Sequence, residues 1–113
     1  MALIEITAEE FPSKVLQADV PVLVDFWGPR CQPCLALMPA VEALADEVSG
    51  QMRVVKMNAN ARANWPVVRE YGVMGLPAYL LFQNGEEVRR LTGKNVTRDT
   101  LAAVVEQLIV VEW

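Results

Sequence analysis

The chain has no histidine, only two cysteines and no run of lysine or arginine among its 113 residues. Without histidine a metal site loses its commonest nitrogen ligand, and two thiolates alone cannot complete a tetrahedral zinc site. A net charge of −4 with no basic run also makes nucleic acid a poor partner. Chemistry in this protein must therefore rest on cysteine, carboxylate, lysine, tyrosine or backbone groups, and we expect no bound metal.

Long hydrophobic runs and targeting patterns are also missing. No apolar stretch is long enough to span a bilayer, and the N-terminal residues lack the basic start and apolar core of a signal peptide. We therefore expect a cytoplasmic protein that does not engage a membrane. No linker, repeat or low-complexity segment divides the chain. With 53% apolar and 21% charged residues, it is expected to form one domain over residues 1–113 and to be a monomer.

The hydrophobic pattern predicts an α/β fold in which strands and helices alternate. Residues 20–26 are almost wholly apolar and β-branched, which is typical of a central strand buried on both faces. Asn84-Gly85 favours a type I′ hairpin turn between the last two strands. Strands are expected in five segments, residues 2–6, 20–26, 52–57, 78–82 and 87–91. The first crossover is expected to be right-handed and parallel, within a mixed sheet that has helices on both faces.

Helices are expected in four segments, after Thr7, over residues 31–49, after Asn64 and after Thr97. Thr7 and Glu10 fit a capping box for the first helix, which should end near Gln17. Asn64 is expected to cap the third helix with its side chain. Pro39 lies inside the second helix and should kink it. Residues 109–113 could finish the last helix or make an intermolecular contact.

The two cysteines, Cys31 and Cys34, follow the apolar strand directly and stand at the start of the long helix over residues 31–49. A helix N-terminus presents unpaired N–H groups and the positive end of the helix dipole, so it stabilises a thiolate. A thiolate is the species that attacks disulfides. A cytosolic C-x-x-C near a β-α-β pattern favours a redox-active dithiol, and a purely structural disulfide is the alternative.

These residues resemble the thioredoxin family. Residues 24–34 read Val-Asp-Phe-Trp-Gly-Pro-Arg-Cys-Gln-Pro-Cys, similar to the active-site strand and helix start of thioredoxins. Further matches follow in order, at Pro39, Lys56, Asn58, residues 71–77, residues 82–86 and Gly93. The resemblance extends over residues 3–110. It implies a thioredoxin fold, with a central mixed sheet of about five strands flanked by four helices.

The resemblance also implies the roles of four candidate catalytic residues. Cys31 would attack a protein disulfide, and Cys34 would resolve the resulting mixed disulfide. Asp25 is a carboxylate inside an apolar strand, so burial should raise its pKa. The matching aspartate of the family moves the proton of the second cysteine. Lys56 matches the lysine partner of that aspartate, or it is an ordinary lysine at a strand end.

Three residues beside the cysteines are expected to tune the redox couple. Arg30 adds a positive charge next to Cys31, or it is a solvated surface arginine. Gln32 stands where thioredoxins usually have glycine, and Pro33 suits the first turn of a helix. If Arg30 and the helix dipole both favour the thiolate, the couple should be somewhat less reducing than that of an ordinary thioredoxin.

Substrate contacts are implied at four positions, Trp27, Leu76, Pro77 and Gly93. By resemblance Pro77 follows a cis peptide bond, and Leu76 pairs through its backbone with extended substrate. Trp27 is expected to pack beneath the site. Trp65 could belong to the core or be an exposed binding residue.

The sequence therefore predicts a thiol–disulfide oxidoreductase that reduces protein disulfides and contributes to electron transport and cell redox homeostasis. It would need no cofactor beyond the Cys31–Cys34 disulfide, because the chain has no nucleotide fingerprint. A thioredoxin-reductase-like flavoenzyme or another dithiol would re-reduce it. One alternative is a thioredoxin-fold binding module with little redox turnover. Another is metal handling by the two thiolates, which would require dimerisation.

Overall fold

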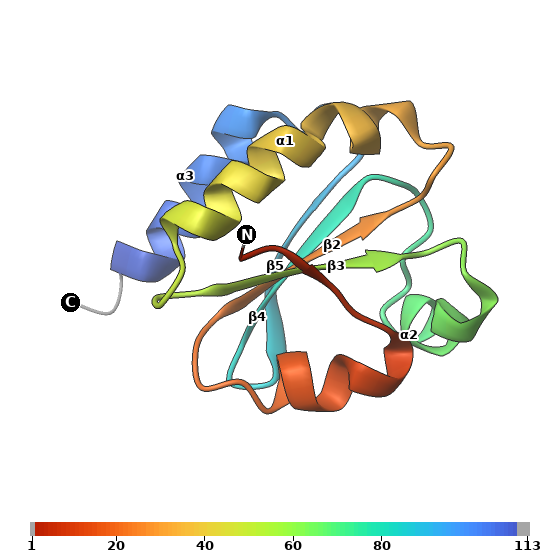
Figure 1. The fold of residues 1–113 in the computed structure, drawn as a ribbon, viewed down its shortest axis with the longest axis horizontal. Helices are drawn as coiled ribbons and strands as arrows, with labels where there is room; N and C mark the ends of the chain where they lie inside the picture. The colour runs from red at the N-terminus through yellow and green to blue at the C-terminus, as the bar shows by residue number, and fades with distance from the viewer. Residues whose placement is uncertain (1, 111–113) are drawn as a thin grey trace.

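A computed structural model of the protein describes residues 2–110 and places a five-stranded mixed sheet at its centre (Figure 1). The strand order across the sheet is β1-β3-β2-β4-β5. β3 is parallel to both β1 and β2, whereas β4 is antiparallel to β2 and to β5. The strands are β1 (Ile4–Glu5), β2 (Val22–Trp27), β3 (Arg53–Asn58), β4 (Ala78–Gln83) and β5 (Glu86–Thr92). The predicted mixed sheet and hairpin are confirmed.

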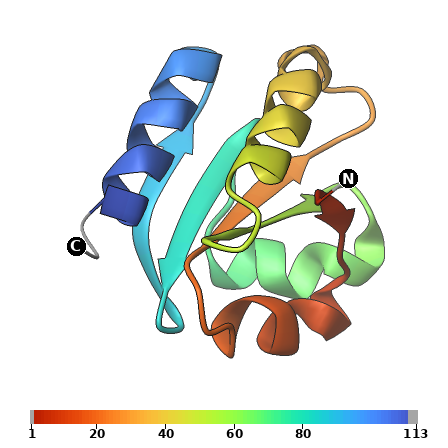
Figure 2. The same ribbon diagram turned by 60° about the vertical axis from the view of Figure 1, so that its left-hand side comes forward.

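Helices cover both faces of this sheet (Figure 2). α1 (Gln32–Glu47) and α3 (Arg98–Val110) lie side by side on one face. α2 (Trp65–Glu70) and the N-terminal helical turns over residues 8–16 cover the other. Residues 111–113, part of the segment expected to finish the last helix, lie outside the described residues. The four predicted helical segments are therefore present, although one of them is not an α-helix.

β2 is buried on both faces and separates two apolar clusters. Val24 and Phe26 point toward the N-terminal turns and α2, where they pack with Phe11 and Leu80. Leu23 points the opposite way and packs with residues of α1 and α3. Because side chains alternate along a strand, Asp25 shares the face of Leu23 and lies beneath α1 and α3. The continuous apolar run of the sequence is thus explained by burial on both sides.

The first helical segment departs from the expected α-helix. A 3₁₀ turn over Ala8–Glu10 is followed by a π-helical turn over Pro12–Leu16. The capping contact is present, because the Thr7 backbone N–H donates to Glu10 Oε1 at 2.9 Å. Pro12 has no N–H to donate to the Ala8 carbonyl, which accepts from the Phe11 N–H in a 3₁₀ turn. The Pro12 carbonyl accepts from the Gln17 N–H at 2.9 Å, five residues on, which is π-helical spacing. The proline therefore breaks the α-helical hydrogen-bond ladder within this segment.

The hairpin between β4 and β5 has the predicted turn chemistry. Asn84 and Gly85 have φ values of 54° and 82°, so both central residues adopt the left-handed conformation that a type I′ turn requires. Arg90 in β5 then donates to the carbonyl of Tyr71 at 2.6 Å and pairs with Glu87 at 2.6 Å. The hairpin thereby anchors the end of α2 and the loop that follows it.

Asn64 does not cap α2 with its side chain, contrary to the prediction. The side chain is 4% exposed and bridges two distant segments. Its Oδ1 accepts from the Ala8 N–H at 2.9 Å, and its Nδ2 donates to the Asn58 carbonyl at 2.9 Å. Asn64 thus ties the N-terminal 3₁₀ turn to the end of β3, and this long-range use of the amide competes with capping.

Replacing Asn64 by alanine should lower the free energy of unfolding by about 1–3 kcal/mol, because it leaves the part-buried Ala8 N–H without its partner and removes one of the two donors to the Asn58 carbonyl. Chemical denaturation measures this. Asn60→Ala is the matched control, since the Asn60 side chain is exposed, and it should change stability by less than about 0.5 kcal/mol. Equal effects of the two substitutions would contradict the bridging role.

Candidate active site

The chain leaves the sheet at the end of β2 and enters α1 through a short turn. The Cys31 N–H donates to the Gly28 carbonyl at 3.1 Å, which closes this turn. Cys31 then takes the N-cap position of α1, and its carbonyl accepts from the Leu35 N–H at 3.1 Å. Pro33 lies in the first turn, where no intrahelical partner for an N–H exists. The local sequence thus places Cys31 at the helix tip.

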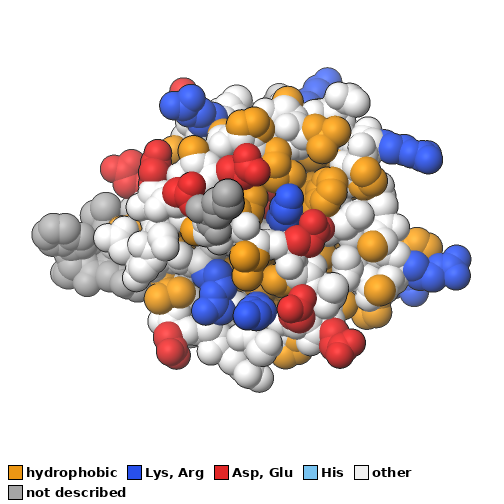
Figure 3. Space-filling view, viewed as in Figure 1, with side chains coloured by type: hydrophobic (Ala, Val, Ile, Leu, Met, Phe, Trp, Pro, Cys, Tyr) orange, Lys and Arg blue, Asp and Glu red, His pale blue; other side chains and the backbone are white. Residues whose placement is uncertain are grey.

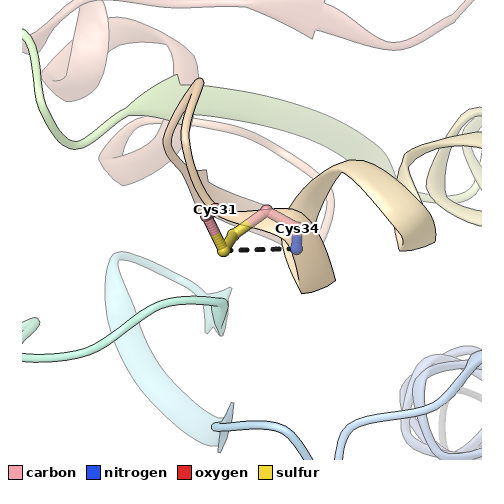
Figure 4. Close-up of a disulfide and its surroundings, with 2 residues drawn as sticks. All are labelled: Cys31 and Cys34. Carbon is pink, nitrogen blue, oxygen red and sulfur yellow. Dashed lines mark hydrogen bonds between the residues drawn. A yellow bond between two sulfur atoms is a disulfide. The ribbon is translucent and has the colours of Figure 1, made fainter.

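The two cysteines form a disulfide, with 5.2 Å between their Cα atoms. The Cys34 backbone N–H donates to Cys31 Sγ at 3.2 Å, and Figure 4 shows this contact at the start of α1. Cys34 is 1% exposed, whereas Cys31 is only partly buried. One sulfur is therefore accessible and faces a helix N–H, while the other is enclosed, as the sequence predicted.

Asp25 lies fully buried on the face of the sheet that α1 and α3 cover, and neither of its carboxylate oxygens has a hydrogen-bond partner among the described residues. Burial raises the pKa of Asp25 to about 7 because it disfavours the charged carboxylate. The positive charge of Lys56 opposes this rise, and the negative charge of Glu5 adds to it. Near neutral pH, both protonation states of Asp25 are populated, so this carboxyl can accept or give a proton.

Lys56 lies opposite Asp25 in the β2–β3 register, but no hydrogen bond joins them. The Lys56 ammonium instead lies 5.3 Å from the ring centroid of Trp27. Trp27 is half-buried, and its Nε1–H donates to Glu5 Oε2 at 3.1 Å. Lys56 therefore acts on Asp25 only through its charge, and Trp27 packs among charged groups at the end of β2.

The loop before β4 forms the opposite wall of the site. The Leu76–Pro77 peptide bond is cis, as the resemblance implied. The Gly93 N–H donates to the Pro77 carbonyl at 3.0 Å and holds this loop against the end of β5. A pocket of about 280 Å³ opens beside the loop, with Leu76 and Gly93 in its lining, and the rim residue Met74 is 96% exposed. The loop thus borders an open pocket of mixed polarity, with the exposed apolar side chain of Met74 at its rim.

Gly28 permits the close approach of this loop to the turn before Cys31. A Cβ atom at Gly28 would lie 2.8 Å from Asn60 Nδ2 and 3.2 Å from Leu76 Cδ1, so a side chain there would require both neighbouring side chains to move. Leu76 therefore lies against the same turn that positions Cys31. No local sequence signal predicts this role of Gly28, because only the tertiary structure brings residues 28, 60 and 76 together.

The predicted tuning residues Arg30 and Gln32 are exposed, and so is Trp65, whose place in the core or on the surface the sequence left open. Arg30 is exposed and makes no hydrogen bond or ion pair with any residue that the structure describes. Gln32 is also exposed. Trp65 is 36% exposed, and the Arg62 and Arg69 guanidinium carbons lie 5.4 Å and 5.6 Å from its ring centroid. Trp65 is therefore a surface residue with two arginine side chains close to its ring.

Tyr79 is a second residue near the site for which the sequence pattern predicted no role. It lies directly opposite Asp25 in the antiparallel β2–β4 register, is fully buried, and its hydroxyl has no hydrogen-bond partner within residues 2–110. Burial raises the pKa of the Tyr79 phenol, and the charge of Asp25 raises it further. The hairpin register could have revealed this neighbour, because pairing β4 against β2 brings Tyr79 to Asp25.

Three further properties of residues 2–110 bear on function. In this part of the chain, no three or more cysteine, aspartate or glutamate side chains gather closely enough to hold a metal ion. None of its helices has the length and hydrophobicity needed to cross a bilayer. Acidic and basic side chains are interspersed over the face shown in Figure 3.

Comparison with known proteins agrees with the geometry of the site. The thioredoxin family model matches residues 2–107. Thioredoxin 1 of Nostoc sp. is 37% identical over 106 residues, which are 94% of this chain and 96% of that protein. Thioredoxin of Porphyra purpurea is 36% identical over 109 residues, 96% of this chain and 99% of the relative. Chloroplastic thioredoxin M4 of Arabidopsis thaliana is 37% identical over 101 residues, 89% of this chain and 51% of its own length.

The family match covers nearly the whole chain and includes the strand, helix and loop that surround the cysteines. The described fold has the five-stranded mixed sheet that the resemblance implied. Its Cys31–Cys34 pair is bonded at the tip of α1. This chain therefore belongs to the thioredoxin family of thiol–disulfide oxidoreductases.

Proposed function

We propose that this protein reduces protein disulfides, with Cys31 as the attacking thiol and Cys34 as the resolving thiol. The observation that carries this assignment is the 3.2 Å contact from the Cys34 N–H to Cys31 Sγ at the N-terminus of α1. That contact and the helix dipole favour a thiolate at Cys31, and the partial exposure of Cys31 lets a substrate disulfide approach. Cys34, at 1% exposure, is better placed for an intramolecular attack.

The reaction then proceeds in two exchanges. The Cys31 thiolate attacks one substrate sulfur, the substrate S–S bond breaks, and the departing thiolate takes up a proton. Cys34 loses its proton and attacks Cys31 Sγ, which releases the second substrate thiolate as the Cys31–Cys34 bond forms. The protein dithiol gives up two electrons, and the substrate disulfide gains them.

Asp25 is proposed to accept the Cys34 proton. It is buried on the face beneath α1, the helix that carries Cys34, and its pKa of about 7 matches a group that exchanges protons near neutral pH. Lys56 is proposed to favour the charged form of Asp25 through its positive charge. Because no hydrogen bond joins Lys56 to Asp25, it is a modulating residue and not a proton carrier.

The substrate is proposed to lie along the loop that contains the cis peptide bond. The Leu76 backbone would pair with an extended segment of the substrate, in the manner of β-strand addition. Pro77 and Gly93 hold this loop, and the exposed Met74 side chain adds an apolar contact at its rim. This arrangement favours backbone recognition of an unfolded or extended segment that carries the disulfide.

The cellular setting is also part of the proposal. A thioredoxin-reductase-like enzyme or another dithiol would return the protein to the reduced state, which places it in cellular electron transport and redox homeostasis. A reducing compartment such as the cytoplasm suits a dithiol that must be regenerated. We further propose that residues 1–113 act as a single domain and as a monomer.

The binding module with little redox turnover is not favoured. Both cysteines are present and bonded, one is accessible, and a carboxyl with a pKa near neutrality lies beneath their helix. A docking surface alone would need none of these features. Replacing both cysteines by serine separates the two functions, because partner binding without turnover would survive the change and disulfide reduction would not.

The single-cysteine variants should behave differently. With a disulfide-containing protein substrate, Cys34→Ser should accumulate a stable mixed disulfide, because Cys31 can attack but no thiol resolves the product. Cys31→Ser should form little or none, since Cys34 is enclosed. Non-reducing electrophoresis with mass spectrometry measures both. Trapping through Cys34 in the Cys31→Ser variant, at a rate equal to that of Cys34→Ser, would reverse the assignment.

Asp25→Asn should stabilise the oxidised protein at high pH. The folded-state pKa of about 7 exceeds the ordinary value of 3.8, so the wild-type protein loses stability as pH rises from about 4 through 7. The amide of the variant cannot ionise, so the stability of Asp25→Asn relative to wild type should increase by about 4 kcal/mol across this window. Urea denaturation at several pH values measures it, with exposed Asp19→Asn as the control. A pH-independent difference would contradict the raised pKa.

Arg30→Gln tests the predicted tuning by charge. Because Arg30 is exposed and screened by solvent, the midpoint potential should become more negative by no more than about 20 mV. Equilibration of both proteins with glutathione buffers measures this, and added salt should shrink the difference. A shift toward a more positive potential would contradict stabilisation of the Cys31 thiolate by Arg30.

A further inference from the structure

Asp25 and Tyr79 form a polar pair inside an otherwise apolar layer. Tyr79 packs among the apolar residues that α1 and α3 cover, yet it ends in a hydroxyl that is buried and, among the described residues, unpartnered. Asp25 lies directly opposite Tyr79 in the β2–β4 pair, and its two carboxylate oxygens are also buried and, among the described residues, without a hydrogen-bond partner. Side chains directly opposite each other in an antiparallel pair have Cβ atoms about 4.5–5.5 Å apart. The buried hydroxyl and the buried carboxylate therefore belong to directly opposed residues, and no direct hydrogen bond joins them.

None of the other described groups around Asp25 donates a hydrogen bond to its carboxylate. Lys56 on β3 affects it by charge alone, and its ammonium lies over the Trp27 ring. Glu5 on β1 is a like charge that accepts from Trp27 Nε1. Cys34 on α1 is bonded to Cys31. Tyr79 on β4 is thus the neighbouring side chain whose O–H is free to donate.

A buried carboxylate is costly unless hydrogen bonds compensate for its lost hydration. A phenol hydroxyl is a good donor to such a carboxylate, and a hydrogen bond to a charged group contributes more than one between neutral groups. Phenylalanine would fill the same volume without that donor. The hydroxyl therefore matters most when Asp25 is charged, which is the state that precedes proton transfer from Cys34.

We propose that Tyr79 is a positioning residue for Asp25: its hydroxyl donates a hydrogen bond to one bridging water, which donates in turn to the Asp25 carboxylate and favours the charged form. This inference rests on the proposed role of Asp25 as the proton acceptor of Cys34. Tyr79 touches neither substrate nor the sulfur atoms in this scheme. Its effect is on the pKa of the buried Asp25 carboxyl.

The test is the pKa of Asp25 in oxidised Tyr79→Phe, followed by carboxyl ¹³C NMR. Loss of the hydrogen bond should raise the Asp25 pKa, with an approximately tenfold decrease in its acid dissociation constant. Tyr71→Phe is the matched control, because Tyr71 packs with Phe11 and Phe82 on the opposite face of the sheet. It should leave the Asp25 titration unchanged. An Asp25 pKa in Tyr79→Phe that equals the wild-type value, or falls below it, overturns the proposal.

A second measurement needs no Tyr79 substitution. In the wild-type protein the Tyr79 Cζ resonance should titrate with the same midpoint as Asp25, and Asp25→Asn should abolish that transition. If the Tyr79 Cζ chemical shift does not change with pH around the Asp25 midpoint, the proposal is overturned even if Tyr79→Phe fails to fold. Neither readout depends on turnover. If Asp25→Asn reduces disulfides at the wild-type rate, the proton-acceptor role fails, while the water-bridged contact between Tyr79 and Asp25 is still judged by NMR.

Discussion

The pairing of β2 with both β3 and β4 is the constraint on which the rest of this structure depends. A strand buried on both faces and hydrogen-bonded along both edges cannot shift register without moving its side chains to the wrong layer. This fixed register puts Asp25 under α1, with Lys56 on one side and Tyr79 on the other. It also delivers the chain to the turn that begins α1 at Cys31. The redox site is therefore held by the central strand of the sheet.

Electrostatics then divide the site into two environments. Cys31 lies at a helix N-terminus that favours negative charge and is open to solvent on one side. Asp25 lies a layer below, where burial disfavours negative charge and raises its pKa to about 7. The first environment makes a nucleophile, and the second holds a proton near neutral pH. Their separation by one layer lets a single small domain provide both.

Much of the fold followed from local signals. The apolar run at residues 20–26 predicted the central strand, Asn84-Gly85 predicted the I′ turn, and Cys31 was placed at a helix start; all three are confirmed. The errors came where other constraints outweighed local preference. Asn64 bridges Ala8 and Asn58 and so does not cap α2. Pro12 has no N–H for the Ala8 carbonyl, which accepts from Phe11 in a 3₁₀ turn, so the first predicted helix is not a continuous α-helix.

The sequence by itself determined the chemistry available, since it has two cysteines at C-x-x-C spacing, no histidine, and a carboxylate inside an apolar strand. Spacing along a helix and alternation along a strand are local properties, so they can be read from the chain alone. Only the tertiary structure decided what surrounds those groups. Cross-strand register brought Tyr79 to Asp25, and the absent side chain of Gly28 let Leu76 lie against the cysteine turn. Both contacts join residues far apart in the sequence, and only folding fixes such distances.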